Sequence, residues 1–319
     1  MAQPSVQRLK GWATALGLAW VAALPLPAWA GSPLQVTASF SILADLTRQV
    51  GGDEVTVHTL VGPDGDAHVY QPTPAAARQL LASGMFVING LGFEGWIPRL
   101  VKASGFQGIL VVASQGIDPL RKGNDHDEAN ENHSPRQDHD HGGGADPHAW
   151  HDLANGRIYL ANIAAGLIRL APERAEIFRA NLQRADQELA DLDRWVRSEL
   201  ESLPPARRKV ITTHDAFGYL ARAYGLVFLA PVGISSDAEP SARDLARLAL
   251  QAKKEGIRAI FLENMTNPRL MQQLAREAGA KIGGTLHADA LSPPDGPAPS
   301  YAQMIRRNIT LLKQAMSGE

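Results

Sequence analysis

Short apolar or alternating runs recur in two parts of the chain, with amphipathic segments between most of them. Runs of this length are typical of strands, and the segments between them have the periodicity of helices. The first part predicts strands over 34–40, 55–61, 85–89 and 108–113, with helices over 42–50 and 74–82. The second part predicts strands over 209–213, 226–230, 259–262 and 281–284, with helices over 216–224, 241–254, 268–278 and 301–315. This alternation predicts an α/β fold with two lobes built on mainly parallel sheets.

The longest helical pattern lies between these two parts. Residues 172–203 contain no glycine and no internal proline, and apolar residues recur among charges throughout them. A helix of roughly thirty residues would be about 45 Å long. We expect one rigid helix to join an N-terminal lobe over residues 31–171 to a C-terminal lobe over 204–319, each large enough for its own core. Such a stiff connection should limit hinging between the lobes.

The N-terminal residues have the pattern of a secretory signal peptide. Arg8 and Lys10 precede an apolar run over 12–26, and Ala28-Trp29-Ala30 gives a small-x-small cleavage site. A retained membrane anchor is the alternative, but the run is short for a bilayer and is interrupted by Pro25 and Pro27 near its end. We therefore expect residues 1–30 to be removed during export.

The chain contains no cysteine. An exported protein of this kind cannot form disulfides, and it lacks the residue that carries the lipid of bacterial lipoproteins. We expect a monomeric periplasmic protein that is not lipid-anchored. Loss of Arg8 and Lys10 would change the formal net charge from −2 to about −4, so the chain has no basic surplus typical of nucleic-acid binding.

Four separate stretches each present one side chain able to bind a metal. They contain His68 in GDAHVYQPTP, His148 in DPHAWHD, His214 in TTHDAFGYLARAYG and Asp289 in GGTLHADALS. Three of these stretches follow predicted strands, where α/β sheets present binding groups. Three imidazoles and one carboxylate match the donor types and the number of ligands that zinc takes. A closed set of four favours metal binding over catalysis.

Several neighbouring side chains compete for these roles. His151 could chelate together with His148, although a solvent-exposed position in the first turn of a helix is the expected role for it. His287 would face the same side as Asp289 on an extended chain and is its main rival. Asp215 could cap the following helix or orient the imidazole of His214. A lone histidine in a loop is otherwise usually only solvated.

A histidine-rich segment spans residues 118–145. His126, His133, His139 and His141 lie among Asp, Glu, Asn and Gly without apolar periodicity. We expect a disordered loop that offers weak, exchangeable metal sites of no single geometry. The alternative is a solvated polar insert that is rich in histidine by chance.

Taken together, these motifs resemble the cluster A-I metal receptors of bacterial ABC importers, the zinc and manganese solute-binding proteins with a helical backbone. The segments that carry the resemblance are GDAHVYQPTPAAARQL, VINGLGFEGW, DPHAWHDLANGRIYLANI, SLPPARRKVITTHDAFGYLARAYGL, IFLENMTNPRL, HADAL and SYAQMIRRNITLL, in the order of that family. The resemblance covers essentially the whole mature chain. It implies a metal site in the cleft between the lobes, with His68, His148, His214 and Asp289 as ligands.

The third ligand distinguishes the metals within the family. Manganese receptors tend to have a carboxylate where this chain has His214, and nitrogen donors favour zinc over manganese. NGLGFEGW is similar to the AztC-like zinc receptors, which accept metal from a periplasmic chaperone. The chain departs from some zinc receptors in lacking a cysteine pair in the C-terminal lobe.

The resulting expectation is a receptor, not an enzyme, that captures Zn²⁺ and delivers it to an ABC transporter permease. A manganese receptor of the same family and a periplasmic zinc buffer without a transporter are the alternatives closest to it. A secreted zinc hydrolase is the third, with Glu263 or Asp215 as general base. Four protein ligands would leave no open position for a catalytic water. Beyond a catalytic role, Glu263 and Asp215 are also candidates to support the ligands from outside the site.

Overall fold

The first lobe is built on a parallel sheet of four strands. The computed structural model describes residues 1–2, 32–121, 144–236 and 240–318. The first sheet has the strand order β2-β1-β3-β4, with the N-terminal strand paired to β2 and β3 on either side. Its strands are β1 (Leu34–Phe40), β2 (Val55–Val61), β3 (Met85–Ile88) and β4 (Ile109–Val112). The predicted bounds of β1 and β2 are confirmed to the residue.

The second lobe repeats the same topology. Its four parallel strands have the order β6-β5-β7-β8, which matches the first sheet strand for strand. They are β5 (Lys209–Ile211), β6 (Val227–Leu229), β7 (Ala259–Glu263) and β8 (Lys281–Leu286). The predicted two-lobed α/β fold is confirmed. In each sheet the order reverses beside the first strand, where the carboxyl ends of the strands form a binding edge.

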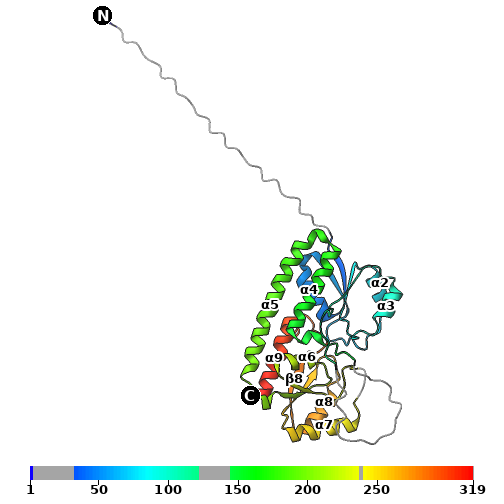
Figure 1. Ribbon diagram of the computed structural model, residues 1–319, viewed down its shortest axis with the longest axis vertical. Helices are drawn as coiled ribbons and strands as arrows, with labels where there is room; N and C mark the ends of the chain where they lie inside the picture. The colour runs from blue at the N-terminus through cyan, green and yellow to red at the C-terminus, as the bar shows by residue number, and fades with distance from the viewer. Residues whose placement is uncertain (3–31, 122–143, 237–239, 319) are drawn as a thin grey trace. The chain divides into compact units, whose positions relative to one another are not determined.

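Four of the described helices belong to the first part of the chain. They are α1 (Ser41–Gly51), α2 (Pro74–Leu81), α3 (Ile97–Ser104) and α4 (Leu153–Leu170). In Figure 1, α2 and α3 lie on one side of the first sheet, and α4 lies on the other. The sequence pattern does not predict α3, because this short helix begins at a Trp-Ile-Pro sequence and follows a glycine-rich turn. It buries Ile97, Leu100 and Ser104 on one face.

The long helix is α5 (Ala175–Glu201), with 27 residues and a length of about 40 Å. The predicted helix over 172–203 is confirmed apart from its ends, since residues Pro172–Arg174 form a 3-10 turn and Leu203 lies beyond the last turn. Helix α5 contacts α1 and α4 of the first lobe and α9 (Tyr301–Ser317) of the second (Figure 1). It therefore supports both lobes along its length.

The second lobe has three further helices, α6 (Gly218–Tyr224), α7 (Ala242–Glu255) and α8 (Arg269–Ala278). Helices α7 and α8 pack on each other and bury a small core that includes Ile211 and Ile260 of the sheet. Ser241 caps α7 by accepting a hydrogen bond from the backbone of Asp244. None of the described helices is both long and apolar enough to span a bilayer.

The largest hydrophobic core is shared between the lobes. It extends from Phe40 and Trp150 in the first lobe, through Leu189 of α5, to Tyr301 and Ile309 of α9. Residues Pro33–Glu319 accordingly form one compact unit. This core continues from the first lobe into the second through α5 and α9, while Ile211 and Ile260 belong to the smaller core of the second lobe. The lobe boundaries at residues 171 and 204 stay a prediction.

Candidate metal site

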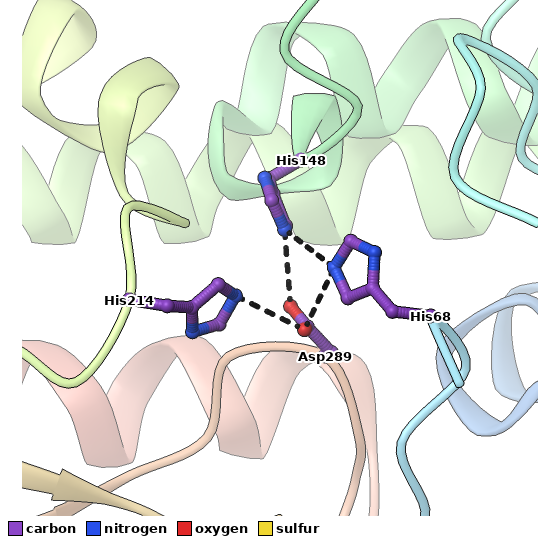
Figure 2. Close-up of side chains that lie close together, drawn as sticks. All are labelled: His68, His148, His214 and Asp289. Carbon is purple, nitrogen blue, oxygen red and sulfur yellow. Dashed lines mark hydrogen bonds and ion pairs between the residues drawn. The ribbon is translucent and has the colours of Figure 1, made fainter. Parts of the chain in front are cut away.

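The structure brings the four predicted side chains together from four separate segments. His68, His148, His214 and Asp289 each point one nitrogen or oxygen toward a common centre (Figure 2), and these atoms all lie within 4.8 Å of one another. The Nε2 atoms of His68 and His148 are 3.3 Å apart, and Asp289 oxygens lie 3.2–3.6 Å from the three imidazoles. Ligands about 2.0–2.1 Å from a tetrahedral metal would be about 3.3 Å from one another. The spacing fits one small cation.

The site is buried, and several of its polar atoms have no hydrogen-bond partner. His148, His214 and Asp289 are buried, and the side chain of His68 is only 6% exposed. Among the described residues, Nε2 of His214 and both carboxylate oxygens of Asp289 are buried without a hydrogen bond. Buried polar atoms without partners are costly unless an ion satisfies them. The residues present therefore fit a bound divalent cation.

His68 and His148 are held by the same backbone hydrogen bond to an aspartate two residues earlier. His68 lies in the loop after β2, and its backbone N–H donates to the carboxylate of Asp66 at 2.9 Å. The backbone N–H of His148 donates in the same way to Asp146 at 3.0 Å. Each aspartate thus closes a turn around the residue two positions later. The spacing Asp-x-His in DAH and DPH was a signal in the sequence that could have revealed this role of Asp66 and Asp146.

Asp146 also fixes the tautomer of His148. Nδ1 of the imidazole lies 2.8 Å from the Asp146 carboxylate, so Nδ1 carries the proton and Nε2 presents its lone pair to the site. His148 stands before a 3-10 turn over Ala149–His151, and α4 begins only at Leu153 with Asp152 as its cap. The expectation that His151 lies in the first turn of a helix is therefore wrong.

His214 is oriented by a carboxylate from the neighbouring strand. Nδ1 of His214 lies 2.5 Å from Glu263 at the end of β7. The second oxygen of Glu263 accepts hydrogen bonds from the backbone of Thr213 and His214. Parallel pairing of β5 and β7 places these residues side by side, which is why residues 49 apart in sequence meet here.

Glu263, and not Asp215, supports His214. No ring nitrogen of His214 is left for Asp215, because Nδ1 binds Glu263 and Nε2 faces Asp289. Asp215 does not cap a helix either, because α6 begins at Gly218 with Phe217 at the cap position. The backbone N–H of Asp215 donates to Gly233. The helix predicted over 216–224 therefore begins two residues later, at Gly218.

Burial and nearby charges together shift the pKa values of the site residues in different directions. Burial lowers the pKa of His148, despite the nearby Asp289. Burial also acts to lower the pKa of His214, but Glu263 and Asp289 outweigh it and hold that pKa well above its usual value. The pKa of Asp289 is well below its usual value, because His214 and His148 outweigh the effect of its burial. The metal-free site therefore favours a proton on His214 beside an ionised Asp289.

The loop over Asn89–Trp96 connects the segments that carry His68 and His148. Nε1 of Trp96 donates to the carbonyl oxygen of Ala67 at 2.8 Å, and the amide of Asn89 donates to Pro147 at 2.9 Å. Each bond acts on the residue directly before a candidate ligand. Phe93 packs edge-on against the ring of His68 at 4.6 Å between centroids. The sequence motif NGLGFEGW carries a family resemblance, but its pattern does not predict these contacts.

Glu94 organises that loop from inside. Its buried carboxylate accepts hydrogen bonds from the hydroxyl of Ser39 at 2.6 Å and from the backbone of Asn89 and Gly90. Burial raises the pKa of Glu94, although these three donors oppose the shift. Gly90 and Leu91 both have positive φ angles, so the loop turns sharply at this point. A buried carboxylate that holds several donors is expected where a tight loop lacks regular pairing.

The two rival histidines lie outside the cluster. His151 is fully buried against Phe217 at 4.7 Å, and burial lowers its pKa to about 3. The expectation that His151 is exposed is wrong, because Ala149–His151 is a 3-10 turn packed into the core. His287 is buried and held through its backbone by Asn308. Strand β8 ends at Leu286 and the chain then bends, so the alternation that made His287 a rival does not continue.

The histidine-rich segment is described only at its ends. Arg121 and Ala145 form an antiparallel bridge that brings the two ends together. His126, His133, His139 and His141 lie outside the described residues.

A surface pocket of about 440 Å³ lies against the second-lobe side of the site. His214, Asp66 and Met265 contribute to its lining. A larger pocket, of about 690 Å³, is lined by the ends of α7 and α8 and contains none of the four site residues. Of these two pockets, the smaller one shares His214 with the candidate metal site.

Known proteins match this chain over nearly its full length. The family model of ZnuA, the periplasmic component A of a zinc-uptake complex, matches residues 36–315. The zinc uptake protein ZnuA of Bacillus subtilis is 30% identical over 90% of this chain and 88% of its own length. The manganese-binding lipoprotein MntA of Halalkalibacterium halodurans is 28% identical over 90% of both chains.

The fold has a match among solved structures as well. The periplasmic zinc-binding protein TroA of Treponema pallidum superposes with a TM-score of 0.80 and 27% identity, over 90% of this chain and 99% of TroA. The match includes both parallel-sheet lobes, and its sequence identity agrees with that of the curated relatives. Together with the family match over residues 36–315, this shows that the chain belongs to the ZnuA family of periplasmic metal-binding receptors of ABC importers.

Proposed function

We propose that this protein captures Zn²⁺ in the periplasm and delivers it to the permease of an ABC importer. The observation that carries the proposal is the buried set of three imidazoles and one carboxylate, with ligand atoms within 4.8 Å of one another. In this proposal His68, His148, His214 and Asp289 are the ligands. Metal is the cargo of such a receptor, so the protein needs tight but reversible binding and no catalytic group.

The donor set supports zinc over manganese. Three nitrogen donors and one carboxylate suit a borderline metal that accepts tetrahedral geometry, whereas Mn²⁺ prefers more oxygen ligands and a higher coordination number. The relatives do not decide between these metals, because one named for zinc and one named for manganese are almost equally similar. A manganese receptor is therefore the second candidate function.

The experiment is a competition titration of the mature protein against a chromophoric chelator, with elemental analysis of the isolated complex. We expect one tight Zn²⁺ per chain and much weaker Mn²⁺ binding. The same titration of His68→Ala tests whether the tight metal occupies the proposed site. Equal or tighter binding of Mn²⁺ would establish the manganese receptor instead.

A zinc hydrolase and a zinc buffer are the alternative functions, and each has a requirement that distinguishes it from a receptor. A zinc hydrolase needs an open coordination position and a general base aimed at it. Glu263, the candidate base, instead accepts three hydrogen bonds that hold His214 and its backbone. A zinc buffer without a transporter would share the ligands but would not stimulate a permease. Zinc-dependent stimulation of the cognate transporter's ATPase activity in proteoliposomes separates receptor from buffer.

Localisation, assembly and accessory partners are also part of the proposal. The signal peptide predicted over residues 1–30 lies almost wholly outside the described residues. The absence of cysteine supports a protein that is not lipid-anchored, although the manganese-binding relative is named a lipoprotein. We propose a monomer that could also receive zinc from a periplasmic chaperone. Cell fractionation and mass determination of the mature chain test the localisation and the assembly state.

A further inference from the structure

Asp289 follows β8 of the second lobe, yet its segment is bound largely to the first. Nε1 of Trp150 donates to the carbonyl oxygen of Ala288 at 3.0 Å. The backbone N–H of Leu291 donates to the hydroxyl oxygen of Ser41 at 2.9 Å. The carbonyl oxygen of Leu291 accepts from the backbone N–H of Asp64, also at 2.9 Å. Asp289 therefore lies between residues that the first lobe holds on both sides.

The second lobe contributes less to this short segment. Between Ala288 and Leu291, the side-chain amide of Asn264 in the second lobe donates to the carbonyl oxygen of Ala290 at 3.2 Å. Asn264 itself donates to the carboxylate of Asp64 in the first lobe at 2.7 Å. The next anchor toward the strand is at His287, whose backbone binds Asn308 of α9.

Helix α1 extends the same attachment further along the chain. Ser41 and Asp45 are four residues apart and so lie on one face of the helix. The carboxylate of Asp45 accepts the backbone N–H of Tyr301, at the start of α9, at 2.8 Å. The loop between Leu291 and Tyr301 is thus held to one face of α1 at both ends, and Ser41 marks the end closer to the metal site.

We propose that Ser41 is a positioning residue for metal binding, which fixes Asp289 in the first lobe by holding the backbone of Leu291. The inference rests on the proposed ligand set. Its consequence is that His68, His148 and Asp289 form one half-site on the first lobe. His214, held by Glu263 at the end of β7, is the ligand that the second lobe adds.

The physical reason is pre-organisation. Ser41 is only 5% exposed, and its loss would leave the buried N–H of Leu291 without an acceptor. A carboxylate on a loosened segment must be ordered when metal binds, and that cost lowers affinity. Ser41 does not touch the metal, so its effect should depend on whether Asp289 is present.

The test is a double-mutant cycle on zinc affinity, measured by competition with chelators of graded strength. Ser41→Ala should weaken Zn²⁺ binding roughly tenfold in the otherwise native protein, as expected for a lost buried hydrogen bond. It should cause a similar loss in the His214→Ala background. In the Asp289→Ala background it should change the affinity less than about twofold, because the segment no longer supplies a ligand.

The matched control is Thr47→Val, which removes a buried hydroxyl from the same helix. That hydroxyl donates to Leu43 within the helix at 2.7 Å and does not reach the Asp289 segment. We expect Thr47→Val to leave zinc affinity unchanged. An equal loss from Ser41→Ala in all three backgrounds, or no loss in the native one, would overturn the positioning role. If Asp289→Ala or His214→Ala alone leaves affinity intact, the proposed ligand set itself fails.

Discussion

The carboxylate of Glu263 lies 2.5 Å from Nδ1 of His214, which makes this the shortest hydrogen bond to a histidine of the metal site. Because the same carboxylate also binds the backbone of His214, it fixes both the ring and the chain that carries it. Carboxylates that hold a metal-binding histidine in this way commonly contribute one to two orders of magnitude to affinity.

Replacement of Glu263 should therefore weaken zinc binding from outside the coordination sphere. We expect Glu263→Gln to reduce affinity about 10- to 100-fold in a chelator competition, because the neutral amide is a weaker acceptor for Nδ1–H. Glu199→Gln is the control, since Glu199 pairs with Lys313 at the surface. Unchanged affinity in Glu263→Gln would show that the contact does not tune the ligand.

The ligand assignment predicts unequal effects for neighbouring residues. His214→Ala and Asp289→Ala should each lower zinc affinity at least 10- to 100-fold, because zinc loses one of four ligands. His287→Ala should retain near-native affinity, since its ring lies outside the cluster. The same competition assay applies to all three. Tight binding by Asp289→Ala together with loss in His287→Ala would indicate a four-histidine site.

Replacement of His151 should lower the stability of the protein without lowering its affinity for zinc. His151→Ala should bind zinc almost as tightly as the native protein, but it should lose roughly 2 kcal/mol or more of stability, because the substitution leaves a cavity in the core. Denaturant unfolding of the metal-free protein measures the stability. A loss of affinity without a loss of stability would place His151 in the coordination sphere.

Protons should compete with zinc mainly at His214. The raised pKa of this residue means that it carries a proton in the metal-free site at and below its pKa, and zinc must displace that proton. Affinity should be highest above that pKa and should fall about tenfold per pH unit below it. The fall should begin above pH 6.5, the usual value for histidine. The lowered pKa of His148 adds no further competition near neutral pH.

Calorimetry in buffers of different ionisation enthalpy measures this release directly. We expect close to one proton per zinc near pH 7. Glu263→Gln should reduce that number, because the Glu263 carboxylate has the largest effect among the charges that raise the pKa of His214. An affinity that stays flat between pH 7 and pH 5 would contradict a site dominated by histidine.

The histidine-rich segment should add capacity without tight affinity. Deletion of residues 125–141 removes four irregularly spaced histidines but none of the four site residues. Total zinc bound at excess metal should fall, and the tightest binding constant should stay almost unchanged. Arg121 and Ala145 are bridged, so the shortened loop can still close. Loss of the tight site would mean that the segment supplies a ligand.

Much of the fold could be predicted because its signals are local. The bounds of β1 and β2 follow from apolar runs of strand length, and α5 follows from a long stretch without glycine. The candidate ligands could be predicted for a related reason, since turn-rich frames after strands mark the binding edge of an α/β sheet. Composition and periodicity act over a few residues, and each of these features is decided within that range.

The remaining features depend on residues that meet only after folding. Glu263 replaced Asp215 as the partner of His214 because β7 pairs with β5. His151 is buried because a 3-10 turn, not a helix, starts the segment after His148. The sequence alone determined which side chains were able to bind a metal. Only the tertiary structure decided which groups orient them and that Asp289 is held from the other lobe, because those contacts depend on packing between segments far apart in the chain.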